Sequence, residues 1–258
     1  MNKIVLFSAI VILIISTSCS KDGDVNFFSV NKDIELGMQL DEQIKAEPQN
    51  YPILDEATHP AAYAKLRAIR DKILTSDDIY YKDRFEWKLT ILADNTLNAF
   101  CAPGGYIYVY TGIINYLDNE NEFAGVLGHE IAHADRRHST DQMTKQYGLS
   151  VMLELALGQG DLTNVAAGLI GLKFSRKDES EADEMSVYYL CDTDYKANGA
   201  AGFFEKITAE GESSTPTFLS THPNPENRVQ NINAKEQELK CTGEVTTGDY
   251  IQFKQDIK

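Results

Sequence analysis

The chain of 258 residues is poor in basic side chains: 24 lysines and arginines stand against 39 aspartates and glutamates, for a formal net charge of −15. Domains that bind nucleic acid usually carry a basic patch, so this balance argues against nucleic acid as a partner. The body of the sequence also lacks a long apolar run. Residues 149–157 and 165–172 are the best candidates, and both are too short to cross a bilayer as a helix.

Cysteine is scarce, with only Cys19, Cys101, Cys191 and Cys241. Three remain after Cys19, an odd number for a protein of an oxidising compartment, so at most one pair forms among them. Cys191 and Cys241 are the candidate pair, and their disulfide would tie the C-terminal segment to a helix. Cys101 lies in a strand-like run without a neighbouring histidine, which predicts a buried small side chain rather than a nucleophile.

The N-terminus has the pattern of a targeting segment: Lys3, an apolar run over residues 4–15, and small residues before Cys19. It resembles a bacterial lipoprotein signal, which predicts a signal peptide over residues 1–18 and lipidation of Cys19. A plain secreted form is the alternative, because Ser16 stands where such signals usually have leucine. Residues 19–32 are predicted to be a flexible tether. Removal of the signal takes Lys3 with it and moves the net charge of the mature protein to −16. The lipoprotein-like signal predicts that the mature protein lies in the bacterial cell envelope, held by lipid at the outer membrane or in the periplasm.

Hydrophobic periodicity predicts an α+β fold, mostly helical, with one domain over residues 33–240 and a tail over 241–258. Two strand regions, 87–92 and 99–110, are rich in aromatic and β-branched residues, and Pro103-Gly104-Gly105 breaks the second. Apolar residues at helical spacing predict helices over 34–46, 61–74, 119–137, 142–157, 162–174, 178–192, 202–210 and 224–239.

The sequence His129-Glu130-Ile131-Ala132-His133 places two imidazoles on one face of a helix, because residues four apart share a face. Both rings can then reach one zinc ion, and Glu130 lies beside the open coordination position. Asn119 and acidic residues begin this helix, and two arginines follow it, as suits the helix dipole. The motif predicts a hydrolase in which zinc activates a water molecule and Glu130 is the general base.

A catalytic zinc usually takes three protein ligands and one water, so a third ligand is required. The predicted helix 178–192 offers Glu179, Glu181 and Glu184 together with Asp183. Glu179 and Asp183 are four apart, so one carboxylate can bind the metal while the other holds a ligand imidazole by its far nitrogen. The spacing alone leaves open which of them does which.

These motifs, together with Ser220-Thr221-His222-Pro223 and Arg228 six residues after His222, resemble the zinc metallopeptidases that include HtpX-type heat-shock proteases and CAAX prenyl endopeptidases. The resemblance covers residues 33–235 and is closest to the soluble periplasmic and lipoprotein members. It implies a gluzincin-type domain with a small sheet beside the motif helix, one zinc ion per chain, Glu179 as third ligand and Asp183 behind an imidazole. The membrane-spanning helices of the other branches are missing, so prenylated substrates are not implied.

His222 and Arg228 are weaker candidates for the active site. The resemblance implies that His222 can approach the zinc and cap the site, and that Arg228 steadies an oxyanion or a ligand carboxylate. A turn histidine and a surface arginine are the alternatives. His138 and His59 are expected to be structural or solvated. Residues 100–110 are either an ordinary core strand or an edge to which an extended peptide adds.

The predicted function is a zinc endopeptidase that acts on unfolded or misassembled envelope proteins. The alternative is an envelope assembly factor or chaperone-like binder that keeps its zinc but cleaves rarely, with His222 blocking the fourth coordination position.

Overall fold

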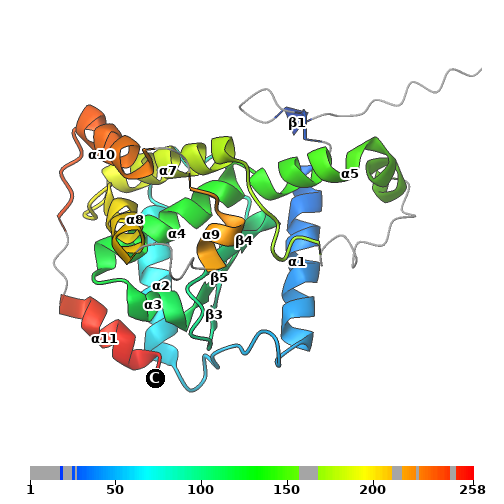
Figure 1. Cartoon of the computed structure of the whole chain (residues 1–258). Helices are drawn as coiled ribbons and strands as arrows, with labels where there is room; N and C mark the ends of the chain where they lie inside the picture. Colours follow the sequence, from blue (N-terminus) through cyan, green and yellow to red (C-terminus); the bar gives the residue numbers. More distant parts are fainter. Residues whose placement is uncertain are drawn as a thin grey trace, which may run out of the picture.

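The computed structural model describes residues 18–19, 25–26, 28–156, 168–210, 217–224, 227–244 and 248–258. It confirms the α+β class: helices surround a small sheet on both faces (Figure 1). The predicted signal peptide and most of the predicted tether lie outside the described residues.

The central sheet has three strands in the order β3-β5-β4, namely β3 (Lys88–Leu92), β5 (Tyr106–Tyr110) and β4 (Ala99–Ala102). β3 runs parallel to β5 and β4 antiparallel to it. The predicted strand regions are therefore confirmed, and the Pro-Gly-Gly sequence forms the single turn η1 (Pro103–Gly105) between β4 and β5. A second, two-stranded sheet pairs β1 (Ser18–Cys19) with β2 (Val25–Asn26).

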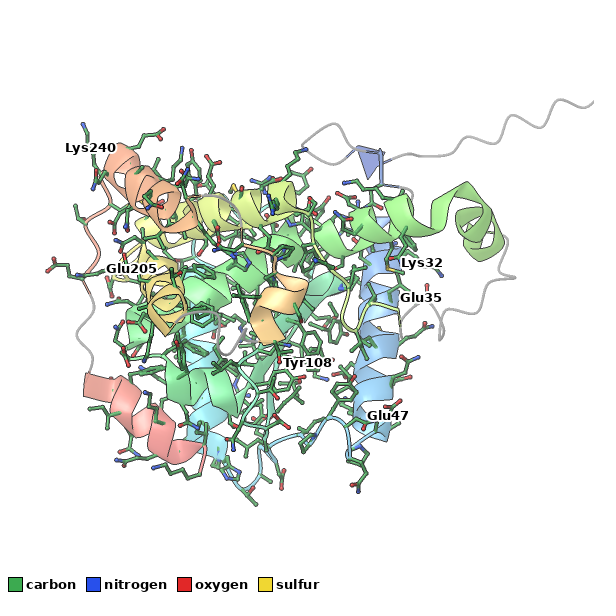
Figure 2. The ribbon with its side chains drawn as sticks, in the orientation of Figure 1. Lys32, Glu35, Glu47, Tyr108, Glu205 and Lys240 are labelled. Carbon is green, nitrogen blue, oxygen red and sulfur yellow. A yellow bond between two sulfur atoms is a disulfide. The ribbon has the colours of Figure 1, made fainter. Side chains whose placement is uncertain are left out.

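Helix α1 (Val30–Ala46) packs directly on η1, and two glycines permit this close approach. A Cβ atom on Gly37 would lie 2.1 Å from the Pro103 carbonyl oxygen, and Gly104 has a φ of +76°. Tyr108 of β5 points from the sheet toward α1 and donates a hydrogen bond to Asp41 (3.1 Å). Lys32 and Glu35 lie on the outer side of α1, and Glu47 lies at its C-terminal end (Figure 2). The turn between two strands thus also fixes the position of α1.

Helix α4 (Glu120–Asp135) lies at the centre of the domain, between the sheet and the helices α7 (Arg176–Cys191) and α8 (Gly199–Glu210) (Figure 1). Glycines on its outer face allow close packing: a Cβ on Gly125 would lie 2.1 Å from the Ala200 nitrogen, and one on Gly128 would lie 2.8 Å from the Ser186 hydroxyl. The other helices in the described part of the chain are α2 (Pro60–Ile73), α3 (Thr111–Tyr116), α5 (His138–Ala156), α9 (Thr217–Thr221), α10 (Arg228–Leu239) and α11 (Gly248–Asp256).

Three predicted helices differ from the structure. The helix predicted over 142–157 corresponds to part of α5, which is kinked at Gly148 (φ 65°, ψ −170°). In the segment predicted as helix 162–174, residues 168–174 form turns and irregular backbone, and Gly171 has a φ of +77°, which interrupts a right-handed helix; residues 162–167 lie outside the described part. The helix predicted from residue 224 begins only at Arg228, after Asn227 in the left-handed region (φ 56°).

The packed part of the chain reaches beyond residues 33–240 at both ends. Phe28 is buried beside α1, and the Arg137 side chain donates to its carbonyl oxygen. Tyr250, Phe253 and Ile257, within or just after α11, are buried in the main core, although residues 241–258 were expected to form a tail. Apolar spacing in α11 covers only two turns, which is too short a pattern to identify a core helix from sequence.

Cys191 and Cys241 form a disulfide with a Cα–Cα separation of 4.9 Å, which confirms the predicted pair. Cys101 is a free, buried cysteine, as expected. Of the helices that the structure describes, none combines the length and apolar character that crossing a membrane would require.

Candidate metal centre

Helix α4 presents His129, Glu130 and His133 to the interior of the domain, and all three side chains are fully buried. The helix begins as the sequence predicts, because the Asn119 side chain accepts a hydrogen bond from the Glu122 amide. The Nε2 atoms of the two histidines lie 2.9 Å apart, so both rings point at one place. The helical spacing of the motif therefore produces the convergence that was expected of it.

Helix α7 brings Glu179 to the same place. Its first turn is fixed by a capping box, in which Ser175 and Asp178 each bond the other's backbone amide. Glu179 Oε1 lies 3.3 Å from His133 Nε2, and Oε2 lies 3.4 Å from His129 Nε2. Glu181 points away from this cluster, toward the end of α4.

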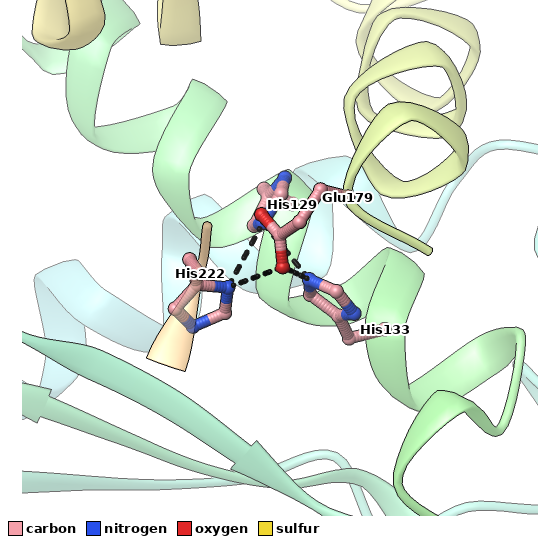
Figure 3. A group of neighbouring side chains, drawn as sticks. All are labelled: His129, His133, Glu179 and His222. Atoms are coloured by element: carbon pink, nitrogen blue, oxygen red, sulfur yellow. Dashed lines mark hydrogen bonds and ion pairs between the residues drawn. The ribbon is translucent and has the colours of Figure 1, made fainter. Parts of the chain in front are cut away.

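His222 completes the cluster from the segment that follows α9. Its Nδ1 atom lies 3.0 Å from Glu179 Oε1 and 3.4 Å from His129 Nε2. Ligand atoms of His129, His133, Glu179 and His222 all lie within 4.8 Å of one another, and all four residues are buried (Figure 3). The structure thus brings together the three predicted ligands and the predicted capping residue.

The α9 segment is held in place by backbone and ring contacts. The Phe218 amide donates to the Leu97 carbonyl, just before strand β4, and the Phe174 amide donates to the Thr221 carbonyl, each at 3.0 Å. The Phe218 ring stacks on the His222 imidazole with a centroid distance of 4.2 Å. His222 is therefore part of a well-packed element that covers the cluster.

The far side of His129 contacts Asp183, the carboxylate that the family resemblance implied would lie behind a ligand imidazole. Asp183 Oδ1 lies 3.0 Å from His129 Nδ1. Arg228, the first residue of α10, is buried and donates to Asp183 Oδ1 at 2.7 Å, and its Nη2 atom lies 3.1 Å from Glu179 Oε2. Its guanidinium also lies over the Phe204 ring. Arg228 therefore contacts two carboxylates of the site and is not a surface residue.

Charge is strongly coupled within the cluster. Burial disfavours the charged form of His129, but contact with Asp183 and Glu179 outweighs it and raises the pKa of His129 to about 9. Burial opposes ionisation of Glu179 too, yet the adjacent His222 and His133 lower the pKa of this carboxyl well below its ordinary value. Burial, and then the neighbouring His129, lower the pKa of His133 well below 6.5. The carboxylates of this cluster thus favour a positive charge between the imidazoles.

The same atoms fit a bound cation. The Nε2 atoms of two imidazoles face each other and a carboxylate here. Their lone pairs repel one another unless a proton or a metal ion lies between them. Both Glu130 oxygens and His222 Nε2 are buried and form no hydrogen bond with another described residue. Nitrogen and carboxylate donors in this number suit zinc, which takes three protein ligands in catalytic sites.

Sequence reasoning did not find the position of His138, which it treated as structural or solvated. The side chain is buried, and its Nδ1 atom lies 2.8 Å from His133 Nδ1. Arg137 adopts the left-handed conformation (φ 61°) between α4 and α5, so the chain turns and brings His138 back beside the motif. A turn of this kind leaves no residue-type signal at a non-glycine position. His59, in contrast, occupies the N-cap position of α2 without a capping hydrogen bond from its side chain, and its Nδ1 atom lies 3.1 Å from the Asp55 carbonyl oxygen.

Comparisons with known proteins agree with this arrangement. Residues 60–236 match the model of Peptidase family M48. The chain is 30% identical to mitochondrial metalloendopeptidase OMA1 of Schizosaccharomyces pombe over 80% of its own length and 62% of that protein. It is 27% identical to the beta-barrel assembly-enhancing protease of Yersinia pestis (65% and 38%) and 31% identical to metalloprotease YcaL of Escherichia coli (53% and 57%). The chain thus spans less than two thirds of each of these relatives.

Proposed function

Because the chain belongs to Peptidase family M48, a family of zinc metallopeptidases, we propose that it is a zinc-dependent endopeptidase in which His129, His133 and Glu179 hold one zinc ion per chain. The observation that carries this proposal is the buried convergence of these side chains beside the carboxylate of Glu130, which forms no hydrogen bond with another described residue and lies 3.6 Å from His222. A purely structural zinc site would have no use for that carboxylate.

The chemistry follows from the positions of the side chains. Zinc bound here would act as a Lewis acid that lowers the pKa of its bound water and polarises the carbonyl group of the peptide bond to be cleaved. Glu130 accepts the proton of the attacking water and passes it to the leaving amine. Burial raises the pKa of Glu130, which makes its carboxylate a stronger base than an exposed one. Arg228 holds Asp183 and Glu179, so of the two roles expected for it, support of a ligand carboxylate agrees with its contacts.

Substitution of Glu130 by glutamine tests the proposal. Glu130→Gln keeps the shape of the side chain but cannot accept the proton, so we expect a loss of at least about 100-fold in casein cleavage with zinc still bound. Glu184→Gln is a matched control, because Glu184 lies on the outer side of α7 and pairs with Lys235. Cleavage by Glu130→Gln at the rate of this control would contradict the role of Glu130.

The contacts of His222 favour a second candidate function. Its Nε2 atom lies 3.6 Å from Glu130 Oε1, so the imidazole occupies the place between the ligands and the general base. A protein that kept this arrangement would bind clients and cleave rarely. Binding of unfolded clients that survives in Glu130→Gln, with no cleavage by the wild type, would support this function. Casein digestion that chelator and Glu130→Gln both abolish would support the peptidase.

The edge of the sheet provides a place for substrate. β4 is an edge strand, paired on one side with β5, and its flank continues into Leu97 beside α9. An extended peptide that adds to this edge would be recognised through its main chain, and its sequence would matter little. Peptides with N-methylated backbone amides at alternate positions should then compete poorly with casein. Equal competition by methylated and unmethylated peptides would argue for an ordinary core strand.

For the biological role, we propose quality control of unfolded or misassembled proteins in a bacterial cell envelope, with the membrane reached through a lipid on Cys19. Support comes from the lipoprotein-like N-terminus and from the relative named as a beta-barrel assembly-enhancing protease. Another relative is named as mitochondrial, so the similarity to relatives does not by itself indicate a compartment. The proposed envelope location therefore depends on the predicted signal peptide over residues 1–18. In a bacterial host, wild type should incorporate labelled palmitate and fractionate with membranes, whereas Cys19→Ala should not. Equal fractionation of the two would contradict the anchor.

A further inference from the structure

A row of three side chains lies behind His133, on the side away from the other three members of the cluster. His133 Nδ1 lies 2.8 Å from His138 Nδ1. The opposite nitrogen of His138, Nε2, lies 3.5 Å from Glu181 Oε2, and Glu181 Oε1 lies 3.4 Å from Arg136 Nε. His138 is buried and Arg136 is largely buried, so the row connects the cluster to the end of α4 through the interior.

The proton positions along this row follow from the ligand. A neutral imidazole that binds a metal through Nε2 carries its proton on Nδ1. His133 Nδ1 must then donate, and His138 Nδ1 must accept with a lone pair. The proton of His138 therefore lies on Nε2, facing Glu181. At 3.5 Å the carboxylate forms no hydrogen bond with His138 Nε2, but its negative charge favours the neutral form with the proton on that nitrogen, which is the one neutral form that can accept from His133.

Ring packing alone cannot fix His133 in the orientation that the metal requires. The Phe174 ring stacks on the His133 imidazole at 4.0 Å with an interplanar angle of 18°, which restrains the plane of the imidazole. Rotation by 180° about the Cβ–Cγ bond would keep that plane and would replace Nε2 with a carbon atom. The contact with His138 distinguishes the two orientations, because only one of them places Nδ1 against an acceptor.

We propose that His138 is a positioning residue that holds His133 in its zinc-binding orientation, and that Glu181, supported by Arg136, sets the tautomer of His138. The inference rests on the proposed ligation by His133. The two motif histidines are then held differently: His129 by the carboxylate of Asp183, and His133 by a neutral imidazole with a carboxylate behind it.

Two substitutions of His138 separate this role from mere packing. His138→Phe keeps a ring of similar shape and removes the acceptor, whereas His138→Asn is smaller but can place its amide oxygen where Nδ1 lies. Partners behind metal ligands usually change metal affinity about 10-fold to 100-fold. We expect His138→Phe to weaken zinc binding by that factor in competition with a chromogenic chelator, and His138→Asn to remain within about 3-fold of wild type. Glu181→Gln should cause a smaller loss than His138→Phe.

The visible spectrum of the cobalt-substituted protein completes the test, and the thermal midpoint of the metal-free protein shows that each variant is folded. His138→Phe should change the cobalt bands, whereas His138→Asn should keep the bands of the wild type. His59→Phe is the control for loss of a histidine ring, because His59 lies at the start of α2 and not on the motif helix.

Wild-type zinc affinity and cobalt bands in His138→Phe would overturn the inference. So would a loss in His138→Asn as large as that in His138→Phe, since packing would then explain both. Ligation itself is tested separately by His133→Ala. If that variant kept full zinc affinity, the ligand assignment would fail; if it lost zinc while His138→Phe did not, only the positioning role would fail.

Discussion

The disulfide between Cys191 and Cys241 should contribute a large part of the stability of this domain. It joins the end of α7 to the residue after the C-cap of α10 and closes a loop of 50 residues. That loop contains α8, α9 and α10 and carries both His222 and Arg228. Loop-closure entropy for 50 residues corresponds to about 4 kcal/mol at 25 °C, and measured values for native disulfides usually lie at about 2–4 kcal/mol.

We therefore expect Cys191→Ser/Cys241→Ser to lower the free energy of unfolding by about 2–4 kcal/mol. For a domain of this size, that loss corresponds to a fall in the thermal midpoint of roughly 4–16 °C. The assay is urea denaturation followed by circular dichroism, with wild type measured with and without reductant. Reduced wild type should match the double variant, and reductant should not affect the variant. A loss below about 1 kcal/mol, or a wild-type curve that reductant leaves unchanged, would refute the reasoning.

Further predictions concern helix packing and the metal. Gly125→Ala should cost about 1–3 kcal/mol, because the added Cβ would lie 2.1 Å from the Ala200 nitrogen on α8. Gly202→Ala, whose Cβ would lie 3.1 Å from the side-chain Cγ atom of Glu122 and near no backbone atom of another helix, should cost less, and equal losses in urea titrations would contradict this assignment. Removal of zinc should lower the thermal midpoint; restoring free zinc to 100 times its dissociation constant should return about 2.7 kcal/mol. Glu130→Gln should show the same zinc-dependent shift, and a midpoint insensitive to zinc would count against the site.

Local geometry made part of the site predictable. The i, i+4 spacing of His129 and His133, and of Glu179 and Asp183, is a property of one helix turn and needs no knowledge of the fold. The capping residues Asn119 and Ser175 then determine where these helices begin. For this reason the two motif helices occur close to where the sequence predicts them. The strands around η1 do so because aromatic and β-branched residues flank the Pro-Gly-Gly turn.

Other parts of the site depend on how helices meet. Arg228 could have been a surface residue by its helical position alone; packing of α10 against α7 buries it between Asp183 and Glu179. The left-handed Arg137 turns the chain and brings His138 behind His133. Similarly, α11 became part of the core because the rings of Tyr250 and Phe253 pack against Phe123, more than a hundred positions earlier in the chain.

The sequence by itself determined the chemistry that this protein offers: a pair of helix-borne imidazoles, a general base beside them, a carboxylate pair one helix turn apart, and a pair of cysteines able to join two helix ends. Only the tertiary structure decided how these groups are held, with His222 over the cluster, Arg228 bridging two carboxylates and His138 behind His133. The physical reason is range: bonds and dihedral angles set the spacing within a helix turn, whereas contacts between helices depend on which buried surfaces fit together.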